Sequence, residues 1–475
     1  MDLRGWQIAS IKQVLAFGGE DEDTDTALKF AYESLSLPHP RATPDAPLAA
    51  ACAGWRGAPG DGGVDRISSL PDEILRNVVS RLPVKDAART GVLASRWRGL
   101  WRAMPLVFSD ANLLQGCRED PLWRPGLENT LGVTNEVSDI LAAHPGPFRC
   151  VHITCCYLDM NREKIKGWLK LVADKGVQEL AFINRPWPLD LRLPTTLFSC
   201  TSLTHLHIGA WKLPDTATLP SAVAFPHLQE LFLSLITMKD RDLAFMLDMS
   251  PVLEVLTIIA SQTDVHLCLV SRSLRCLQLG MSSLGDIAVA DAPRLERFFL
   301  LMTTCGLDEP DSDSDSDDEP TIRVRIASAP SLKVVGYLDT KLHQLQIGVT
   351  VIEDATEVSA SFMIPSVKIL ALRANFRVFT EVQMLSSFLR CFPNVETLHV
   401  EFAIADRPTG KHYGKFLSKL SPIECLRSHT KKVVLHEFRG DLSEVVFIQH
   451  LMQRVNQLQH LTIVLSRIYY FQWIT

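Results

Sequence analysis

Between residues 65 and 105, hydrophobic residues recur at the spacing of an α-helix. The run Leu70-Pro71-Asp72-Glu73 predicts a helix start, because proline fits the first turn and the two acids suit the positive helix end. Apolar residues then share one helical face at Ile74, Leu75, Val78, Val79 and Leu82. A second short helix is expected over 85–93, and a third is expected from Trp97, Leu100, Trp101 and Met104. Three short helices form a marginal core, so we expect part of this apolar surface to meet a partner.

From residue 148 onward the period changes, and apolar residues recur at positions i, i+3 and i+5. Eleven such sets occur, and the first seven begin 21 to 29 residues apart. They start at Phe148, Val177, Leu203, Leu228, Leu253, Leu274, Leu295, Leu332, Val367, Val395 and Leu458. This period predicts a degenerate leucine-rich repeat, in which the i+3 and i+5 side chains of stacked parallel strands share a continuous core. A doubly wound α/β domain is the alternative, although long amphipathic helices are scarce between the runs.

The remaining segments complete the predicted domain organisation. Residues 1–63 are rich in Pro, Ala and Gly towards their end and predict a disordered leader or linker, and residues 106–147 predict a connector. The repeats extend over 148–424. The acidic stretch 308–319 interrupts them and predicts a disordered insertion, because like charges repel. The fold class is therefore α/β, with a small three-helix domain followed by an irregular solenoid that contains a parallel sheet.

Composition and charge exclude several classes of protein. Hydrophobic residues make up 47% of the chain, yet no apolar run approaches the roughly 20 residues that cross a bilayer. The formal charge is −6, but the acidic stretch holds 8 of the 54 acids, and the other 46 nearly balance 48 bases. This balance argues against nucleic-acid binding and against a polybasic membrane anchor. Eleven scattered cysteines, no glycosylation sequon and no signal-peptide core favour the nucleus or the cytoplasm.

Candidate catalytic and metal-binding chemistry is sparse. No glycine-rich phosphate loop lies in a strand–helix context, and no C-x-x-C pair occurs. Cys150, Cys155 and Cys156 cluster, but neighbouring strand residues point to opposite faces, which disfavours a zinc site. His205 and His207 share a strand face without an evident third ligand. We therefore predict no catalytic residue, no metal and no cofactor.

The segment 65–105 resembles the plant form of the F-box motif over about 41 residues. The match rests on the LPDEIL start, the RTGVL middle and the RWRGLW end, in the expected order and spacing. The resemblance implies docking to a Skp-type adaptor and, through it, to a cullin. A local charge of +4 in this segment would suit an acidic partner. Resemblance and helical face together predict an adaptor interface formed by Leu70, Pro71, Ile74, Leu75, Leu82, Val92, Leu93, Trp97 and Trp101.

The C-terminal segment 425–475 carries a second resemblance, to the FBD region that follows the repeats in many plant F-box proteins. The matching points are Cys425-Leu426, Ser428-His429, Lys432-Val433, Phe438-Arg439-Gly440 and a helix over 444–455. On that helix Phe447, Leu451 and Val455 are spaced at i, i+4 and i+8. The pattern predicts a strand, a helix and a strand that cap the open end of the solenoid.

These features predict a non-catalytic substrate-recognition subunit of an SCF-type (Skp–cullin–F-box) ubiquitin ligase. The F-box would bind the adaptor, and the repeats would hold a target protein near the conjugating enzyme, so that proximity raises the rate. One alternative is a repeat scaffold that binds the adaptor without promoting ubiquitylation. Another is a Cys-dependent transferase, which the missing nucleophile–base pattern disfavours.

The repeat phase also predicts where a target would bind. If i+3 and i+5 point inward, then i+2, i+4 and i+6 line the exposed face of the sheet. Several of these positions are too apolar to face only water, and aromatic and arginine anchors are typical of binding hot spots. We therefore predict target contacts at Phe232, Arg297 and Phe299. The alternative is that a loop or the C-terminal cap covers this face.

Overall fold

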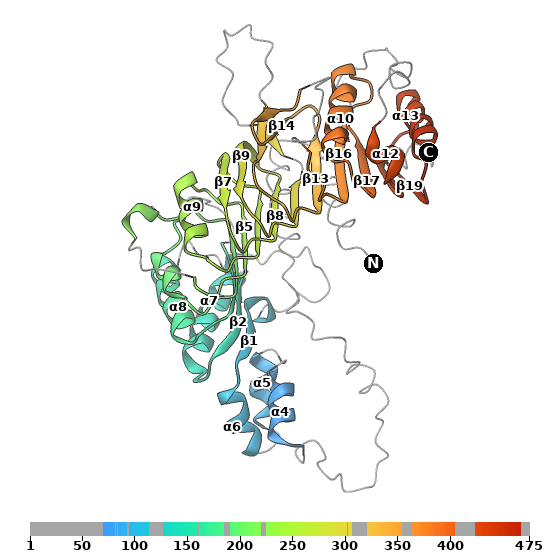
Figure 1. Cartoon of the computed structure of the whole chain (residues 1–475). Coiled ribbons are helices and arrows are strands. Elements are labelled where there is room, and N and C mark those ends of the chain that lie inside the picture. The colour runs from blue at the N-terminus through green and yellow to red at the C-terminus, as the bar shows by residue number, and fades with distance from the viewer. Residues whose placement is uncertain are drawn as a thin grey trace, which may run out of the picture. The chain divides into compact units, whose positions relative to one another are not determined.

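The computed structural model describes most of the chain from residue 70 to residue 466. The described residues are 70–80, 82, 84–92, 95–113, 127–154, 156, 158, 161–184, 191–219, 225–301, 303–305, 321–353, 363–403 and 423–466. The predicted leader 1–63, the acidic insertion 308–319 and Leu93 lie outside these residues. The chain divides into two compact units, residues 1–228 with 234–237 and residues 229–233 with 238–475. Figure 1 labels their helices and strands.

The described part of the first unit begins with the three expected short helices, α4 (Asp72–Val79), α5 (Val84–Thr90) and α6 (Ser95–Ala103). Each is too short to be stable in isolation, so packing must hold the group together. Leu75 and Val79 of α4 are fully buried, and they share the small core with Ala87, Trp97 and Leu100. The predicted three-helix domain is therefore confirmed.

Four parallel strands follow in the first unit, in the order β1 (Leu106–Ser109), β2 (Phe148–Ile153), β3 (Glu179–Ile183) and β4 (His205–Gly209). Between them lie η1 (Asp110–Leu113), α7 (Leu127–Ala143), α8 (Arg162–Asp174), η3 (Thr195–Ser199) and, after β4, η4 (Thr216–Thr218). The predicted inward pair of β3, Leu180 and Phe182, lies in register with Leu206 and Ile208 of β4, and all four side chains are buried. The i+3 and i+5 phase is thus correct here.

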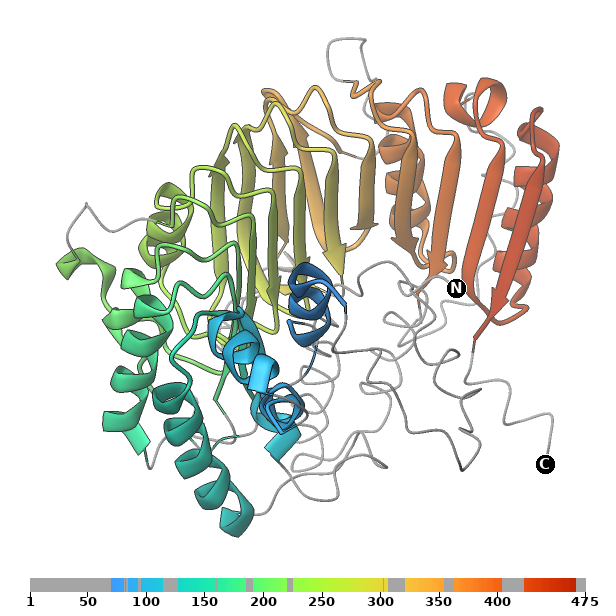
Figure 2. The ribbon, with the colours of Figure 1, turned by 90° about the horizontal axis from the view of Figure 1, so that it is seen from below.

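In its described residues, the second unit carries a longer parallel sheet and four helices. Its strands are, in spatial order, β5 (Glu230–Ser234), β6 (Val255–Ile259), β8 (Cys276–Gly280), β10 (Arg297–Leu301), β13 (Val334–Asp339), β16 (Ile369–Ala374), β17 (Thr397–Phe402), β18 (Lys432–Phe438) and β19 (His460–Leu465). Its helices are α9 (Asp240–Asp248), α10 (Phe379–Cys391), α12 (Glu424–Ser428) and α13 (Leu442–Arg454). In Figure 2, α10 and α13 (orange and red) lie along one face of the strands of the same colours.

The core of this sheet follows directly from the repeat pattern. Leu256, Leu277 and Phe298 stand in register on β6, β8 and β10, and the next inward residues of these strands are also buried. A fully buried side chain of this size stabilises the fold by about 1.5–3 kcal/mol. One repeat cannot bury its own inward pair, so the stacking of neighbours supplies the stability.

A second sheet was not expected from the repeat pattern. It contains β7 (Val265–Val270), β9 (Ser283–Asp291), β11 (Thr304–Cys305), β12 (Ile322–Ile326), β14 (His343–Ile347) and β15 (Thr350–Val351). Strands therefore take the place that helices occupy in the other repeats. β7 and β12 alternate between buried and exposed side chains, which is the period-2 signal of a sheet with one face in water.

One detail of the predicted phase needs correction. Tyr337 was expected to point inward, but it is half-buried and Leu338 is fully buried instead. The pairing of β13 with β16 shifts between Val335 and Leu338. Gly336 allows the close approach, because an added Cβ would lie 2.5 Å from the Cβ of Ala371.

The 63-residue interval between the last two predicted repeats contains β18, which was predicted as the first strand of the C-terminal strand–helix–strand but not as a repeat. Thr430, two residues before β18, occupies the first core position of this repeat instead of a hydrophobic residue. The Thr430 hydroxyl bonds the carbonyl oxygens of Val395 and Cys425, at 3.1 and 3.0 Å, so this polar residue is buried and satisfied. A pattern search restricted to apolar residues cannot find such a repeat.

Candidate functional site

The structure divides the predicted adaptor-binding residues into three groups. Pro71, Ile74 and Val92 are exposed, with Ile74 at 48% and Val92 at 85%. Leu70, Leu82 and Trp101 are half-buried. Leu75 and Trp97 lie inside the helical core, where Trp97 is only 2% exposed. Fewer of these residues are therefore exposed than their predicted helical face implied.

Helix α4 has two apolar faces in the structure, where the sequence analysis predicted one. Ile74 and Val78 are exposed, whereas Leu75 and Val79 are buried, so two adjacent apolar stripes run along this helix. Sequence reasoning merged the stripes and left Val78 out of the predicted interface. The sequence does contain a signal for the second stripe, because Ile74/Val78 and Leu75/Val79 form two i, i+4 pairs offset by one residue. Together these pairs make an apolar surface that is wider than a short helix needs for its own core.

A packed junction joins the three-helix domain to the first strands of the same unit. Trp101 stacks on His144 with ring centroids 5.3 Å apart, and His144 lies 4.9 Å from the Phe148 ring. The Lys175 amino group donates to the His144 carbonyl oxygen and lies 5.5 Å from the Phe148 ring centroid. Burial lowers the pKa of His144. Trp101 thus contributes to the contact that orients this domain relative to the strands.

The proposed target residues lie on the face of the second unit's sheet that is opposite its core. We call this the open face; it is formed by the i+2, i+4 and i+6 positions of each strand. Phe232, Arg297 and Phe299 all occupy it and are half-buried. Arg297 stands in register between Cys276 and Val334 and has no ion-pair partner among the residues that the structure describes. An unpaired cation with an apolar neighbour on each side can recognise an acidic group.

The open face changes character along β13, β16 and β17. The Arg373 guanidinium lies 3.5 Å from both Asp339 and Glu401, so it links three neighbouring strands. Further along, His399 Nδ1 and His436 Nε2 are 3.1 Å apart, and the two rings are stacked. The half of the face around Phe299 is therefore more apolar, and the half around Arg373 is charged and internally paired.

The Phe438-Arg439-Gly440 motif forms a turn that Glu444 holds in place. Oε2 of Glu444 accepts the backbone N–H of Arg439, Gly440 and Asp441 at 2.8, 3.0 and 3.3 Å. Oε1 accepts the Arg439 side chain at 2.9 Å, and that guanidinium also donates to the Ala403 carbonyl oxygen. Gly440 has φ +82°, a conformation that suits glycine. The motif is therefore a structural brace at the start of α13.

The strand–helix–strand prediction for this region is confirmed, and Phe447, Leu451 and Val455 are buried. β19 is the last strand of the sheet in the described part of the chain. Its residues Ile463, Val464 and Leu465 remain exposed. The segment therefore adds one more repeat to the solenoid, and the expected cap over its end is not seen among the described residues.

One Cys–His contact resembles a catalytic pair only in its distance. Cys150 Sγ and His152 Nε2 are 2.9 Å apart, and both residues are buried. Burial raises the pKa of the Cys150 thiol and lowers the pKa of His152 to about 4, so both groups stay neutral at pH 7. Among the described residues no cluster of three or more His, Cys, Asp or Glu is placed to hold a metal, and no helix is long and apolar enough to cross a membrane.

Three family models match the chain in the order of its structural parts. The F-box domain model matches residues 67–109, and the FBD model matches residues 418–463. Between them, the model described as FBD-associated F-box protein At5g56370, LRR repeats, matches residues 165–400. These matches cover the three-helix domain, most of the strands and the braced turn with α13.

Similar proteins of Arabidopsis thaliana carry some or all of these domain terms in their names. Putative F-box/FBD/LRR-repeat protein At4g00315 is 32% identical over 232 residues, which cover 46% of this chain and 48% of the relative. F-box/FBD/LRR-repeat protein At1g78750 is 28% identical over 255 residues, or 50% and 53% of the two chains. FBD-associated F-box protein At5g60610 is 30% identical over 227 residues. The chain thus spans about half the length of the curated relatives that it matches.

Proposed function

This chain belongs to the plant F-box/FBD/leucine-rich-repeat proteins, and on that premise we propose that it is the substrate-recognition subunit of an SCF-type ubiquitin ligase. The F-box would bind a Skp-type adaptor and, through it, a cullin. The observation that carries this proposal is the exposed apolar surface of Ile74, Val78 and Val92 on the three-helix domain. Exposed apolar side chains on so small a domain are typical of a protein-binding surface.

The target would bind the open face of the repeats. Phe232 and Phe299 offer aromatic anchors, and Arg297 offers a positive charge whose strand neighbours Cys276 and Val334 are apolar. Aromatic and arginine side chains contribute most to binding in such settings. We therefore propose that the target presents an acidic side chain beside apolar ones.

Catalysis of ubiquitin transfer would remain with the other subunits of the complex. This chain would raise the rate by holding its target near the conjugating enzyme, since tethering increases the effective concentration. The junction at Trp101 and His144 supports this role, because a packed junction keeps the adaptor-binding domain oriented on the first strands. We propose that the protein acts in the nucleus, the cytoplasm or both.

The decisive experiment measures adaptor binding by the full chain. Changing Ile74 and Val92 to Asp places charge in the proposed interface without touching the helical core. We expect a loss of affinity for a recombinant Skp-type adaptor of roughly thirtyfold or more, which corresponds to at least about 2 kcal/mol. Val349→Asp is the matched control, because Val349 is 89% exposed in the second unit. Unchanged affinity in the Ile74/Val92 variant would refute the proposed interface.

Reconstitution with adaptor, cullin and conjugating enzyme separates the ligase role from a scaffold role. A ligase subunit should promote ubiquitylation of its bound target, and the Ile74/Val92 variant should not. If adaptor binding is normal and no bound target is ever modified, the chain is a scaffold.

A further inference from the structure

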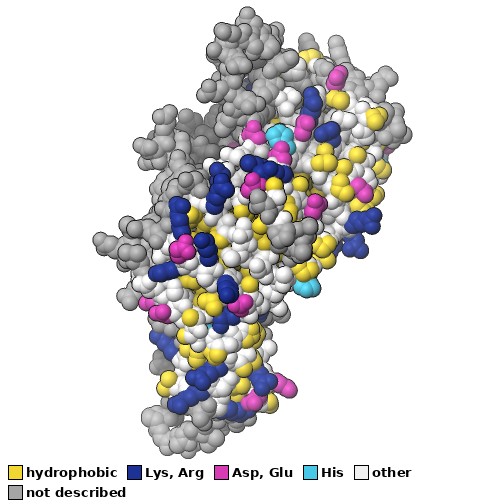
Figure 3. All heavy atoms as spheres, turned by 90° about the vertical axis from the view of Figure 1, so that its left-hand side faces the viewer, with side chains coloured by type: hydrophobic (Ala, Val, Ile, Leu, Met, Phe, Trp, Pro, Cys, Tyr) yellow, Lys and Arg dark blue, Asp and Glu magenta, His cyan; other side chains and the backbone are white. Residues whose placement is uncertain are grey.

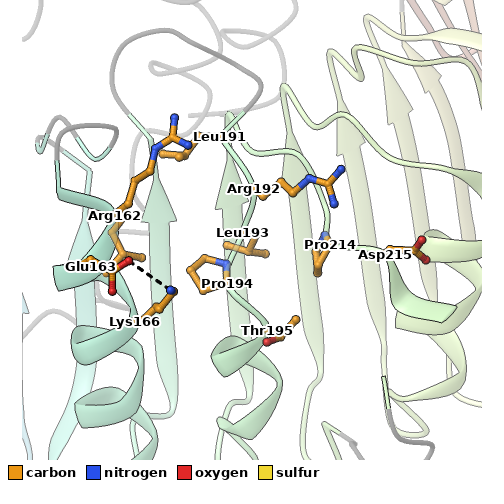
Figure 4. A pocket seen from close by; sticks show the side chains of 11 residues that line it. Arg162, Glu163, Lys166, Leu191, Arg192, Leu193, Pro194, Thr195, Pro214 and Asp215 are labelled. Carbon is orange, nitrogen blue, oxygen red and sulfur yellow. Dashed lines mark hydrogen bonds and ion pairs between the residues drawn. The ribbon is translucent and has the colours of Figure 1, made fainter. Parts of the chain in front are cut away.

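The last described strand of the sheet, β19, has the sequence HLTIVL and therefore carries no Asp, Glu, Lys or Arg. Other surfaces mix charges of both signs with hydrophobic side chains, as on the face shown in Figure 3. A pocket of about 550 Å³ beside α8 has this mixed character, because both Arg192 and Asp215 line it and Lys166 lies 3.4 Å from Glu163 (Figure 4). That lining favours no particular ligand, whereas β19 offers apolar side chains without a competing charge.

The inward row of side chains stays buried along the sheet and becomes exposed at β19. Val433 and Leu435 of β18 are fully buried, and they stand in register with Leu461 and Ile463 of β19. Ile463 is nevertheless 41% exposed, and Leu465, two residues further along the same face, is 56% exposed. A repeat cannot bury its inward side chains without a neighbour, so a further strand beside β19 would complete this core.

The backbone of β19 is also open on one side. The strand pairs with β18, and among the described residues no strand pairs with its other edge. The N–H and C=O groups along such an edge are a template for pairing with another strand. Edge strands are commonly protected by charged residues or by Pro, and β19 contains neither Pro nor any Asp, Glu, Lys or Arg. The edge is therefore suited to receive another strand.

The order of residues in β19 suits pairing with a second copy of the same strand. A twofold axis perpendicular to the sheet makes the two copies antiparallel and keeps both core faces on the same side. With Ile463 on that axis, Leu461 of each copy lies opposite Leu465 of the other, so the inward residues form one continuous apolar row. On the other face, Thr462 lies opposite Val464. No pair in this register brings two like charges together.

The area of contact sets the strength of such a dimer. Stable interfaces bury about 800 Å² of each partner, and the edge of a six-residue strand contributes less than this. Helix α13 runs along the same end of the sheet (Figure 2) and its Met452 is 55% exposed, so this helix can add to the contact. We therefore expect a dissociation constant in the micromolar range.

We propose that β19 is a self-association edge, through which two copies of this chain pair as antiparallel strands with Ile463 on the twofold axis. The inward residues of each copy then complete the core of the other. A dimer of this kind holds two adaptor-binding domains and two target faces in one complex. The proposal is independent of the ligase role, because β19 shares no residue with the predicted adaptor interface or with the target residues of the open face.

The first test measures self-association of the full chain by sedimentation velocity at concentrations from about 1 to 200 µM, which bracket a micromolar dimer. The original chain should pass from monomer to dimer over this range. Ile463→Asp places two carboxylates on the twofold axis and should weaken the dimer about tenfold or more. Val270→Asp is the matched control, because Val270 is 66% exposed on β7, away from the proposed contact. Thermal melting shows whether each variant is folded, and the cysteine variants below decide the matter if Ile463→Asp is not.

Cysteine cross-linking tests the register of the two strands. Opposed residues on antiparallel strands have Cα atoms about 4.5–5.5 Å apart, which is within the range of a disulfide. Ile463→Cys should therefore form a disulfide-linked dimer under mild oxidation. Val464→Cys should not, since the two copies of residue 464 are offset by two residues, or about 7 Å along the strand. The original chain provides the background from its native cysteines.

Residues 467–475 follow β19 in the sequence and include Phe471 and Trp473, so they are the competing occupant of this edge. Changing Phe471 and Trp473 together to Ser should leave the dimer unchanged. Four results would overturn the proposal. They are a monomer at every concentration, an equal loss in Val270→Asp, a cross-link at residue 464 but not at residue 463, and a dimer that forms only when Phe471 and Trp473 are changed. The last result would assign the edge to residues 467–475.

Discussion

His343 offers a sharp test of how burial controls ionisation in this fold. It begins β14 in the second sheet and is only 3% exposed. Its Nδ1 accepts the backbone N–H of Asp339 at 2.9 Å, so the ring proton must be on Nε2, which lies 2.9 Å from the Thr303 hydroxyl. The ring is therefore bonded on both sides in its neutral form, and a second proton would break the bond to Asp339.

The expected magnitude follows from the shift in pKa. Burial, with a smaller contribution from the Arg373 charge, lowers the pKa of His343 from 6.5 to about 3. The folded state favours the neutral ring. The contribution of His343 to the free energy of unfolding is therefore full above about pH 6.5 and is lost as the pH falls towards 3. At pH 5, about 1.5 units below the pKa of this histidine in the unfolded chain, protonation lowers the free energy of the unfolded state. The free energy of unfolding therefore falls by about 2 kcal/mol.

The perturbation is His343→Asn, which removes the titrating ring and leaves a side-chain oxygen that can accept the Asp339 N–H. Loss of the Thr303 bond and of ring volume should lower stability at pH 7.5 by about 1–3 kcal/mol. The key quantity is the further loss between pH 7.5 and pH 5, measured by urea unfolding followed by circular dichroism. The variant should lose about 2 kcal/mol less than the original chain over this interval. Amide hydrogen exchange along β14 provides the local readout.

His144 and His152 also have lowered pKa values, but they titrate equally in both chains and cancel in the comparison. If the two chains lose the same free energy between pH 7.5 and pH 5, then His343 does not have the environment described above. Faster exchange of β14 amides at pH 5 only in the chain with His343 would agree with the reasoning.

Two other substitutions test the junction and the open face. Gly146→Ala should lower the melting temperature and speed proteolysis between the F-box and the first strands, because an added Cβ would lie 2.3 Å from the Arg102 carbonyl oxygen. Gly167→Ala is the control, since a Cβ added there meets nothing within 4 Å. Changing Phe232 and Phe299 to Ser should leave the melting temperature nearly unchanged and abolish target capture, whereas gross unfolding would show that these side chains belong to the core.

Much of the candidate site could be predicted because its signals are local. The positions of Phe232 and Phe299 on the open face follow from the period-2 geometry of a strand once the phase of the repeat is known. The adaptor surface was only partly predictable. Leu75 and Ile74 are equally apolar neighbours on one short helix, and only packing against α6 decides that Leu75 is buried and Ile74 exposed.

The charged cluster on the open face could not be found from sequence at all. Asp339, Arg373 and Glu401 are separated by up to 62 residues, and nothing in their local sequence links them. They come together because β13, β16 and β17 pair side by side, which places the Arg373 guanidinium 3.5 Å from both carboxylates. Such a cluster depends on long-range register, which no local pattern contains.

The sequence by itself determined the class of fold. A repeated pair of inward apolar side chains is buried only when each repeat stacks on its neighbours. It also determined the three-helix domain and the strand–helix–strand at the C-terminal end. Tertiary structure alone decided the second sheet, the slip at Gly336 and the burial of Thr430, whose hydroxyl is satisfied by carbonyl oxygens from Val395 and Cys425. Hydrophobic periodicity reports which side of an element leaves water. It does not report which distant backbone atoms will be close enough to satisfy a buried polar group.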